Sequence, residues 1–179
     1  DLPVFFAEEQ QFRQRWLWGL LLGAALIAPA IIVGFYGSDA WPHKTEAGQF
    51  AAWVAVGFGL FISVPIHLGL CALFYFMKLL TEVRADGIYV RFIPFHRSCE
   101  RIPFSRIKSH GVRRYRPIAE YGGWGVRLSW GKAGKAYNAY GDEGVQLVLS
   151  DDSKLLIGSQ RASEFSSAID KAMKRNVGA

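Results

Sequence analysis

The chain of 179 residues has little cysteine and no catalytic signature. Its two cysteines occupy different settings, since Cys71 lies in an apolar run and Cys99 in a polar region. This pattern excludes a four-cysteine zinc site and gives no sign of a secreted disulfide scaffold. The glycine–lysine segment 131–136 lacks the Walker A spacing, and no GxSxG or HExxH motif occurs. We therefore expect no catalytic residue, no metal and no cofactor.

Positive charge is scarce in the first part of the chain. Residues 1–77 contain three basic and five acidic residues, a net charge of −2. Residues 78–179 contain 18 basic and 10 acidic residues, a net charge of +8. An apolar first part joined to a basic, polar second part argues against a soluble single-domain enzyme.

Two long uncharged runs fill most of the first part. Residues 16–37 would form a helix of about 33 Å, at 1.5 Å per residue, which is enough to cross the core of a bilayer. Residues 50–77 form a second such run, and the connection 38–49 between them is short. The sequence therefore predicts a transmembrane helical hairpin over residues 16–78.

The flanking charges predict an orientation for this hairpin. Arg13 and Arg15 precede the first run, and Lys78 and Arg84 follow the second, whereas Lys44 is the only basic residue of the connection. The positive-inside rule then places both termini in the cytoplasm. We expect residues 1–15 to form an interfacial amphipathic lead-in, with a helix over 7–15.

Small and polar residues punctuate the two runs. Gly19 and Gly23 form a GxxxG pattern, and Gly57 and Gly59 interrupt the second run. Such positions let helices approach closely, so they either seal the hairpin or dock a partner helix. His67 and Cys71 share one face of the second run, and we expect a neutral histidine that is hydrogen-bonded to a neighbouring helix.

Residues 79–179 have the pattern of a β domain that ends in a helix. Turn residues separate short strand-like runs, which we place at 88–95, 107–113, 124–130, 136–140, 145–149 and 154–157. Apolar residues then recur at helical spacing from Phe165 to Met173, and Ser159 is a candidate N-cap. The sequence predicts six or seven strands in a curved antiparallel sheet, with one end covered by the helix.

Three segments carry a family resemblance: TEVRADGI at 81–88, YGGWGVR at 121–127 and LIGSQR at 156–161. Together with the order of spans and strands, they resemble an uncharacterised family of two-span bacterial membrane proteins with a pleckstrin-homology-like domain. The resemblance implies an α+β membrane protein of the bacterial inner membrane, with both termini cytoplasmic. It implies no catalytic residue and no established ligand.

The strongest chemical feature is a run of basic residues, which we call the basic patch. Seven cations fall within 20 residues, with Glu100 as the only acid among them: Arg97, Arg101, Arg106, Lys108, Arg113, Arg114 and Arg116. Three interpretations stay open: a solvated face beside an anionic leaflet, recognition of a lipid head group, and docking on an acidic protein surface. Nucleic acid is the weakest alternative because no nucleic-acid motif occurs.

A second candidate surface is the segment Tyr121, Gly122, Gly123 and Trp124. Adjacent glycines permit a tight corner at the start of a strand, and the same segment is a candidate edge for a partner. We expect a non-enzymatic scaffold or accessory subunit that binds other integral membrane proteins, as in photosynthetic or respiratory complexes. The alternative is an anionic-lipid-binding module, and an enzyme or transporter component comes third.

Overall fold

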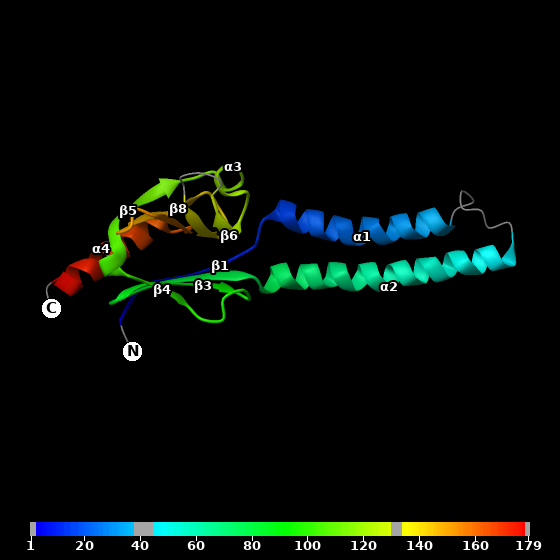
Figure 1. The fold of residues 1–179 in the computed structure, drawn as a ribbon, viewed down its shortest axis with the longest axis horizontal. Coiled ribbons are helices and arrows are strands. Elements are labelled where there is room, and N and C mark those ends of the chain that lie inside the picture. The colour runs from blue at the N-terminus through cyan, green and yellow to red at the C-terminus, as the bar shows by residue number, and fades with distance from the viewer. Residues whose placement is uncertain (1–2, 38–44, 130–133, 178–179) are drawn as a thin grey trace. The chain divides into compact units, whose positions relative to one another are not determined.

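The computed structural model describes residues 3–37, 45–129 and 134–177 (Figure 1). It divides the chain into two compact units. One unit, Arg13–Tyr75, contains two helices, and we call it the hairpin. The other joins Asp1–Phe12 to Phe76–Ala179, and we call it the β domain.

The hairpin consists of α1 (Arg15–Gly37) and α2 (Glu46–Phe76). Helix α1 agrees with the predicted run 16–37, and α2 begins four residues before the predicted run 50–77. Residues 38–44 of the predicted connection, including Lys44, lie outside the described residues. Both helices are long and apolar enough to cross a membrane. Most of their large apolar side chains are exposed, as in Leu26 at 74% and Phe61 at 75%.

The first sheet contains the chain on both sides of the hairpin. Its order is β1 (Val4–Gln11), β2 (Lys78–Arg84), β3 (Gly87–Ile93) and β4 (Glu100–Pro103), and all neighbours are antiparallel. Three residues separate β1 from α1, and one residue separates α2 from β2. The hairpin is therefore an insertion between two paired strands of one sheet.

Strand β1 shows that the helix predicted over residues 7–15 is wrong. Residues 4–11 pair along their length with β2, with Gln11 opposite Lys78. The side chain of Phe6 is buried and stacks on Phe165, with ring centroids 5.1 Å apart. Glu9, which with Arg13 has the i,i+4 spacing of a helix, lies in this strand and pairs with Lys78 of the neighbouring strand at 3.2 Å.

The second sheet has five strands in the order β5-β8-β9-β7-β6. They are β5 (Ile107–Arg114), β6 (Gly125–Leu128), β7 (Lys135–Asn138), β8 (Glu143–Leu149) and β9 (Lys154–Gly158). A short 3₁₀ helix, η1 (Phe104–Arg106), connects the sheets. Five of the six predicted strands overlap strands of this sheet, with shorter bounds at β6 and β7, and the sixth, 88–95, overlaps β3 of the first sheet. Position 130 lies outside the described residues. The prediction of one antiparallel sheet is wrong, because there are two sheets and β7 pairs with β9 in parallel.

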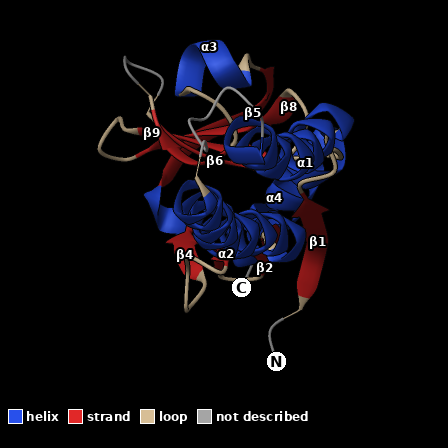
Figure 2. Ribbon diagram, turned by 90° about the vertical axis from the view of Figure 1, so that its right-hand side faces the viewer, coloured by secondary structure: helices blue, strands red, loops and turns tan. Residues whose placement is uncertain are grey.

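The C-terminal helix α4 (Ala162–Val177) packs against both sheets. It contacts β1 and β2 of the first sheet and β5 and β8 of the second (Figure 2). Its apolar face is buried as the helical spacing predicts, with Phe165, Ile169 and Ala172 fully covered. Burial of large apolar side chains of this kind stabilises a fold by about 1.5–3 kcal/mol each. Helix α4 is thus the element that joins the two sheets into one core.

Candidate functional site

The basic patch is largely neutralised within the chain. Five of its seven residues form ion pairs: Arg101 with Asp86 (3.0 Å), Arg106 with Asp151 (4.0 Å), Lys108 with Asp152 (2.6 Å), Arg114 with Asp142 (2.7 Å) and Arg113 with Glu120. The five members lie on both sheets and on η1, so they do not form one strand face. Within the described part of the chain, no ion pair joins Arg97 or Arg116 to a carboxylate. The patch therefore offers far fewer unpaired cations than its sequence suggests.

The four candidate packing glycines separate into two kinds. A Cβ atom added at Gly59 would lie 3.1 Å from Ile32 of α1, so this glycine allows the two helices of the hairpin to approach closely. Cβ atoms added at Gly19, Gly23 or Gly57 would meet nothing within 4 Å. Of these four glycines, only Gly59 therefore lies in the close contact between the two helices. The GxxxG pattern of α1 lies outside that contact.

The segment 121–124 is a helix end followed by a strand start. The short helix α3 (Pro117–Tyr121) ends at Gly122, which is left-handed at φ 69°, and the N–H groups of Gly122 and Gly123 donate to carbonyls of the helix at 2.9 Å. This is the hydrogen-bond pattern of a glycine C-cap. Tyr121 is buried, and the Trp124 Nε1–H donates to the carbonyl of Gly141 at 3.2 Å. Tyr121 therefore has no surface to offer a partner, and the corner interpretation fits the geometry.

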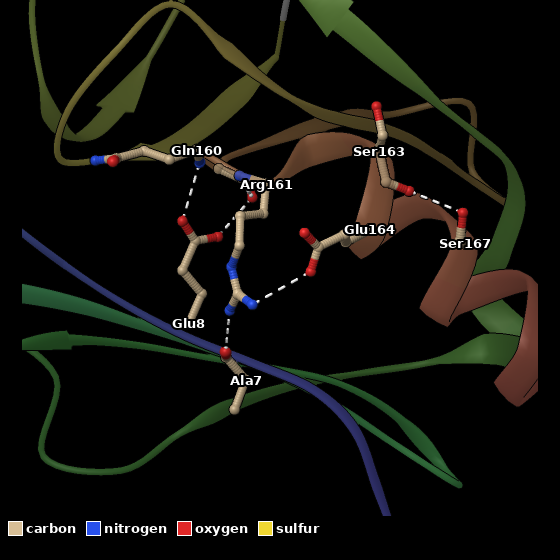
Figure 3. Close-up of polar contacts among 8 residues, drawn as sticks. Ala7, Glu8, Gln160, Arg161, Ser163, Glu164 and Ser167 are labelled. Atoms are coloured by element: carbon tan, nitrogen blue, oxygen red, sulfur yellow. Dashed lines mark hydrogen bonds and ion pairs between the residues drawn. The ribbon is translucent and has the colours of Figure 1, made fainter.

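A cluster of polar contacts, which we call the clasp, joins β1 to the residues just before α4 (Figure 3). Sequence reasoning did not find it. The Glu8 carboxylate accepts hydrogen bonds from the Gln160 N–H at 2.9 Å and the Ser159 hydroxyl at 2.5 Å. The Ser159 hydroxyl in turn accepts from the Arg161 N–H at 3.0 Å, and the Arg161 guanidinium donates to the Ala7 carbonyl at 2.5 Å. These contacts satisfy backbone donors just before the helix, where an acidic side chain is favourable.

An open groove of about 430 Å³ lies between β1 and α4. It is lined by Phe5 and Phe6 on the strand and by Ser163, Ser167 and Lys171, among others, on the helix. The Ser167 hydroxyl donates to the Ser163 carbonyl at 2.9 Å, a bond within the helix. The groove therefore has serine side chains on its helix side and two phenylalanines on its strand side.

A serine, a histidine and an aspartate meet where β5 packs against α4. The ring of His110 lies 3.2 Å from the Ser166 hydroxyl through Nδ1 and 3.2 Å from Asp170 through Nε2. Ser166 and Asp170 stand on α4 and His110 on β5, so these contacts tie β5 to α4.

A second titratable cluster joins the two sheets. Tyr137 of β7 donates a hydrogen bond to Glu100 of β4, and Lys135 Nζ lies 3.3 Å from the same carboxylate. Burial alone would raise the pKa of Glu100, but the bonds from Tyr137 and Lys135 outweigh it and hold that pKa below its usual value. Burial and the contact with Glu100 raise the pKa of Tyr137. Glu100 thus remains ionised at neutral pH and links β4 to β7.

His67 and Cys71 both lie on α2. His67 Nδ1 lies 2.7 Å from the Ser63 carbonyl of its own helix, and the expected bond to a neighbouring helix stays a prediction. Cys71 is a free thiol. Among the residues that the structure describes, no group of three or more His, Cys, Asp or Glu side chains could hold a metal ion.

One family of proteins matches most of this chain. The sequence has no match among curated proteins. Residues 25–174 match a family described as a family of unknown function, DUF6141. The matched range includes most of α1, all of α2 and most of the β domain through α4. The chain therefore belongs to the DUF6141 family.

Proposed function

We propose that this protein is a non-enzymatic, membrane-anchored scaffold or accessory subunit of a larger membrane protein complex. The observation that carries the proposal is the unused GxxxG pattern of α1. Gly19 and Gly23 lie one turn apart and meet nothing within 4 Å, so their surface is open to another helix. Small residues of this kind let helices pack closely in membranes, where van der Waals contact drives association.

The topology supports the proposal that both termini lie on the same side of the membrane. Strand β1 precedes the hairpin and β2 follows it, and the two strands pair residue by residue. If α1 and α2 span a membrane, the paired strands must lie on the same side of it. The flanking cations Arg13, Arg15, Lys78 and Arg84 favour the cytoplasmic side, in the inner membrane of a bacterium. We also propose that the β domain is pleckstrin-homology-like, because sheets followed by a C-terminal helix fit that class.

The ion pairs of the basic patch favour a protein partner over electrostatic capture of lipid. Each Lys or Arg near an anionic leaflet contributes about 1 kcal/mol of attraction. Five of the seven cations already face a carboxylate of their own chain. A lipid-binding module that depends on this patch would therefore lose most of its attraction.

The proposal is tested by extracting native membranes in mild detergent, followed by native-gel sizing and mass spectrometry. We expect the protein to migrate with a larger defined complex. The double variant Gly19→Leu/Gly23→Leu should release it, because the added side chains block close helix approach. Gly69→Leu is the control, since Gly69 lies on α2, outside the GxxxG pattern, and an added Cβ there also meets nothing within 4 Å. Migration of the wild-type chain alone would contradict the proposal.

A further inference from the structure

The loop between β3 and β4, residues 94–99, occupies a defined end of the first sheet. Ile93, the last residue of β3, pairs with Lys78, the first residue of β2, and Lys78 pairs with Gln11, the last residue of β1. Lys78 comes two residues after the end of α2, and Gln11 comes four residues before α1. The loop therefore leaves the sheet at the end where the chain leads into both helices.

An aromatic row connects this loop to the start of the hairpin segment. The ring of Phe92 lies 6.1 Å from that of Phe12, in an edge-to-face arrangement, and 5.9 Å from that of Phe95. Phe12 is the last residue of the β domain before the hairpin begins. With strands about 4.8 Å apart and two further residues of chain, Phe95 lies within about 12 Å of Lys78.

The loop is held in shape by His96. Its N–H donates to the Phe92 carbonyl at 2.7 Å, and the Phe92 N–H donates to the ring nitrogen Nδ1 of His96 at 3.3 Å. The Arg91 guanidinium donates to the His96 carbonyl at 3.3 Å, and the His96 ring meets Tyr137 edge to face at 5.6 Å. A loop fixed in this way presents its remaining side chains in one arrangement.

The side chains that this fixed loop presents are amphipathic. Phe95 is 60% exposed although it is a large apolar residue, and Arg97 beside it is exposed. No ion pair joins Arg97 to a carboxylate of the described residues, in contrast to five other members of the basic patch. Interfacial segments bury Phe, Trp and Leu side chains at the boundary between head groups and acyl chains, and an arginine binds phosphate oxygens there.

We propose that residues 94–99 form an interfacial anchor, in which Phe95 inserts into the lipid head-group boundary and Arg97 binds lipid phosphates. The proposal rests on the proposed insertion of the hairpin into a membrane. The occupant is the lipid layer at the side of the membrane where both helices leave the sheet. The anchor works through one apolar ring and one cation, and it does not depend on the paired residues of the basic patch.

The test uses the full chain in vesicles of phosphatidylcholine and phosphatidylglycerol. Cys71→Ser and Cys99→Ser remove the native thiols, and one new cysteine at Phe95, Val4 or Leu26 carries an environment-sensitive fluorophore. Val4 is the matched control, because it is 52% exposed and lies at the other end of the sheet, opposite Arg84. Leu26 lies within α1 and is 74% exposed, so it reports on insertion of the hairpin.

Quenching by nitroxide lipids separates the outcomes. Because an interfacial group lies about 5–10 Å into the boundary, we expect the probe at 95 to be quenched about twofold more than the probe at 4, by shallow nitroxides. The probe at 26 should be quenched most by deep nitroxides. If the probe at 26 behaves so while those at 95 and 4 remain alike, the anchor is refuted and the hairpin proposal stands. If the probe at 26 is not quenched, membrane insertion fails and the anchor fails with it.

Discussion

At the scale of single residues, two neighbouring glutamates of β1 show how position decides what a charge contributes. Glu8 is half-buried and binds Ser159 and the backbone of Gln160, so removing it leaves donors without an acceptor. Glu9 is exposed and pairs with Lys78 in solvent. The two side chains have the same chemistry, but one is half-buried and the other is in solvent.

We expect Glu8→Ala to lower the free energy of unfolding of the β domain by about 1–3 kcal/mol, because it removes a half-buried charged acceptor. Glu9→Ala should cost less than about 1 kcal/mol, as for exposed ion pairs. Urea unfolding of the full chain in detergent, followed by near-UV circular dichroism, measures both. Equal losses of unfolding free energy in the two variants would show that the clasp stabilises the domain no more than an exposed ion pair does.

The hydroxyl of Tyr115 makes stability depend on pH above neutrality. Burial raises the pKa of Tyr115 to about 12, whereas the pKa of an unfolded tyrosine is about 10. The folded state therefore holds its proton where the unfolded state loses it. This contribution is fully present below pH 10 and is lost as pH rises toward 12, by roughly 3 kcal/mol in total. Tyr115→Phe should remove that part of the slope, and an unchanged difference between pH 9 and pH 12 would contradict it.

Sequence reasoning at this scale found the cations and missed their partners. The seven members of the basic patch are visible as a run, but Arg114 meets Asp142 only because β5 pairs with β8. Glu8 gave no local signal for the same reason, since its partners lie about 150 residues away. Contacts of this kind are set by tertiary pairing and are not encoded in a local pattern.

At the scale of elements, β1 is the segment where the local pattern and the fold disagree. Its residues suit an amphipathic helix by i,i+4 spacing, but β2 supplies a paired strand and α4 supplies a core for Phe6. Strands β3 and β8 were predictable, because alternation over several residues is a local property. Helix α1 was predictable because a long uncharged run is local as well.

The strand assignment of β1 predicts that side-chain truncation at Phe6 and at Val4 has different effects on stability. Phe6→Ala should destabilise the β domain by about 3–5 kcal/mol, since it empties a buried ring site. Val4→Ala should change stability by less than about 0.5 kcal/mol, because Val4 is exposed. The same denaturation measurement compares them. An interfacial helix at this position would leave the stability of the β domain unchanged in both variants.

The end of α3 predicts a backbone effect at one glycine. Gly122 is left-handed at φ 69°, and Gly122→Ala should cost about 1–2 kcal/mol. Gly111→Ala in β5 is the control, because an added Cβ meets nothing within 4 Å there. Thermal unfolding should separate the two, and a neutral Gly122→Ala would argue against the helix C-cap.

At the scale of the whole molecule, the central feature is the insertion of the hairpin between β1 and β2. The sequence indicates two apolar runs followed by a β domain, but it does not indicate that residues 4–11 belong to that domain. The pairing of Gln11 with Lys78 joins chain segments separated by the whole hairpin. The fold therefore requires both ends of the hairpin to be on one side of any membrane that it spans.

The most direct test is labelling of single cysteines in intact cells that express the full chain, with a membrane-impermeant maleimide. All chains carry Cys71→Ser. Thr45→Cys and Val4→Cys are each introduced together with Cys99→Ser, and the third chain keeps native Cys99 as its single cysteine. Thr45 adjoins the start of α2, whereas Val4 and Cys99 belong to the β domain. We predict labelling at 45 in intact cells, and labelling at 4 and 99 only after permeabilisation. Labelling at 4 and 99 from opposite sides, or protection of 45 with labelling of 4 and 99, would contradict the account.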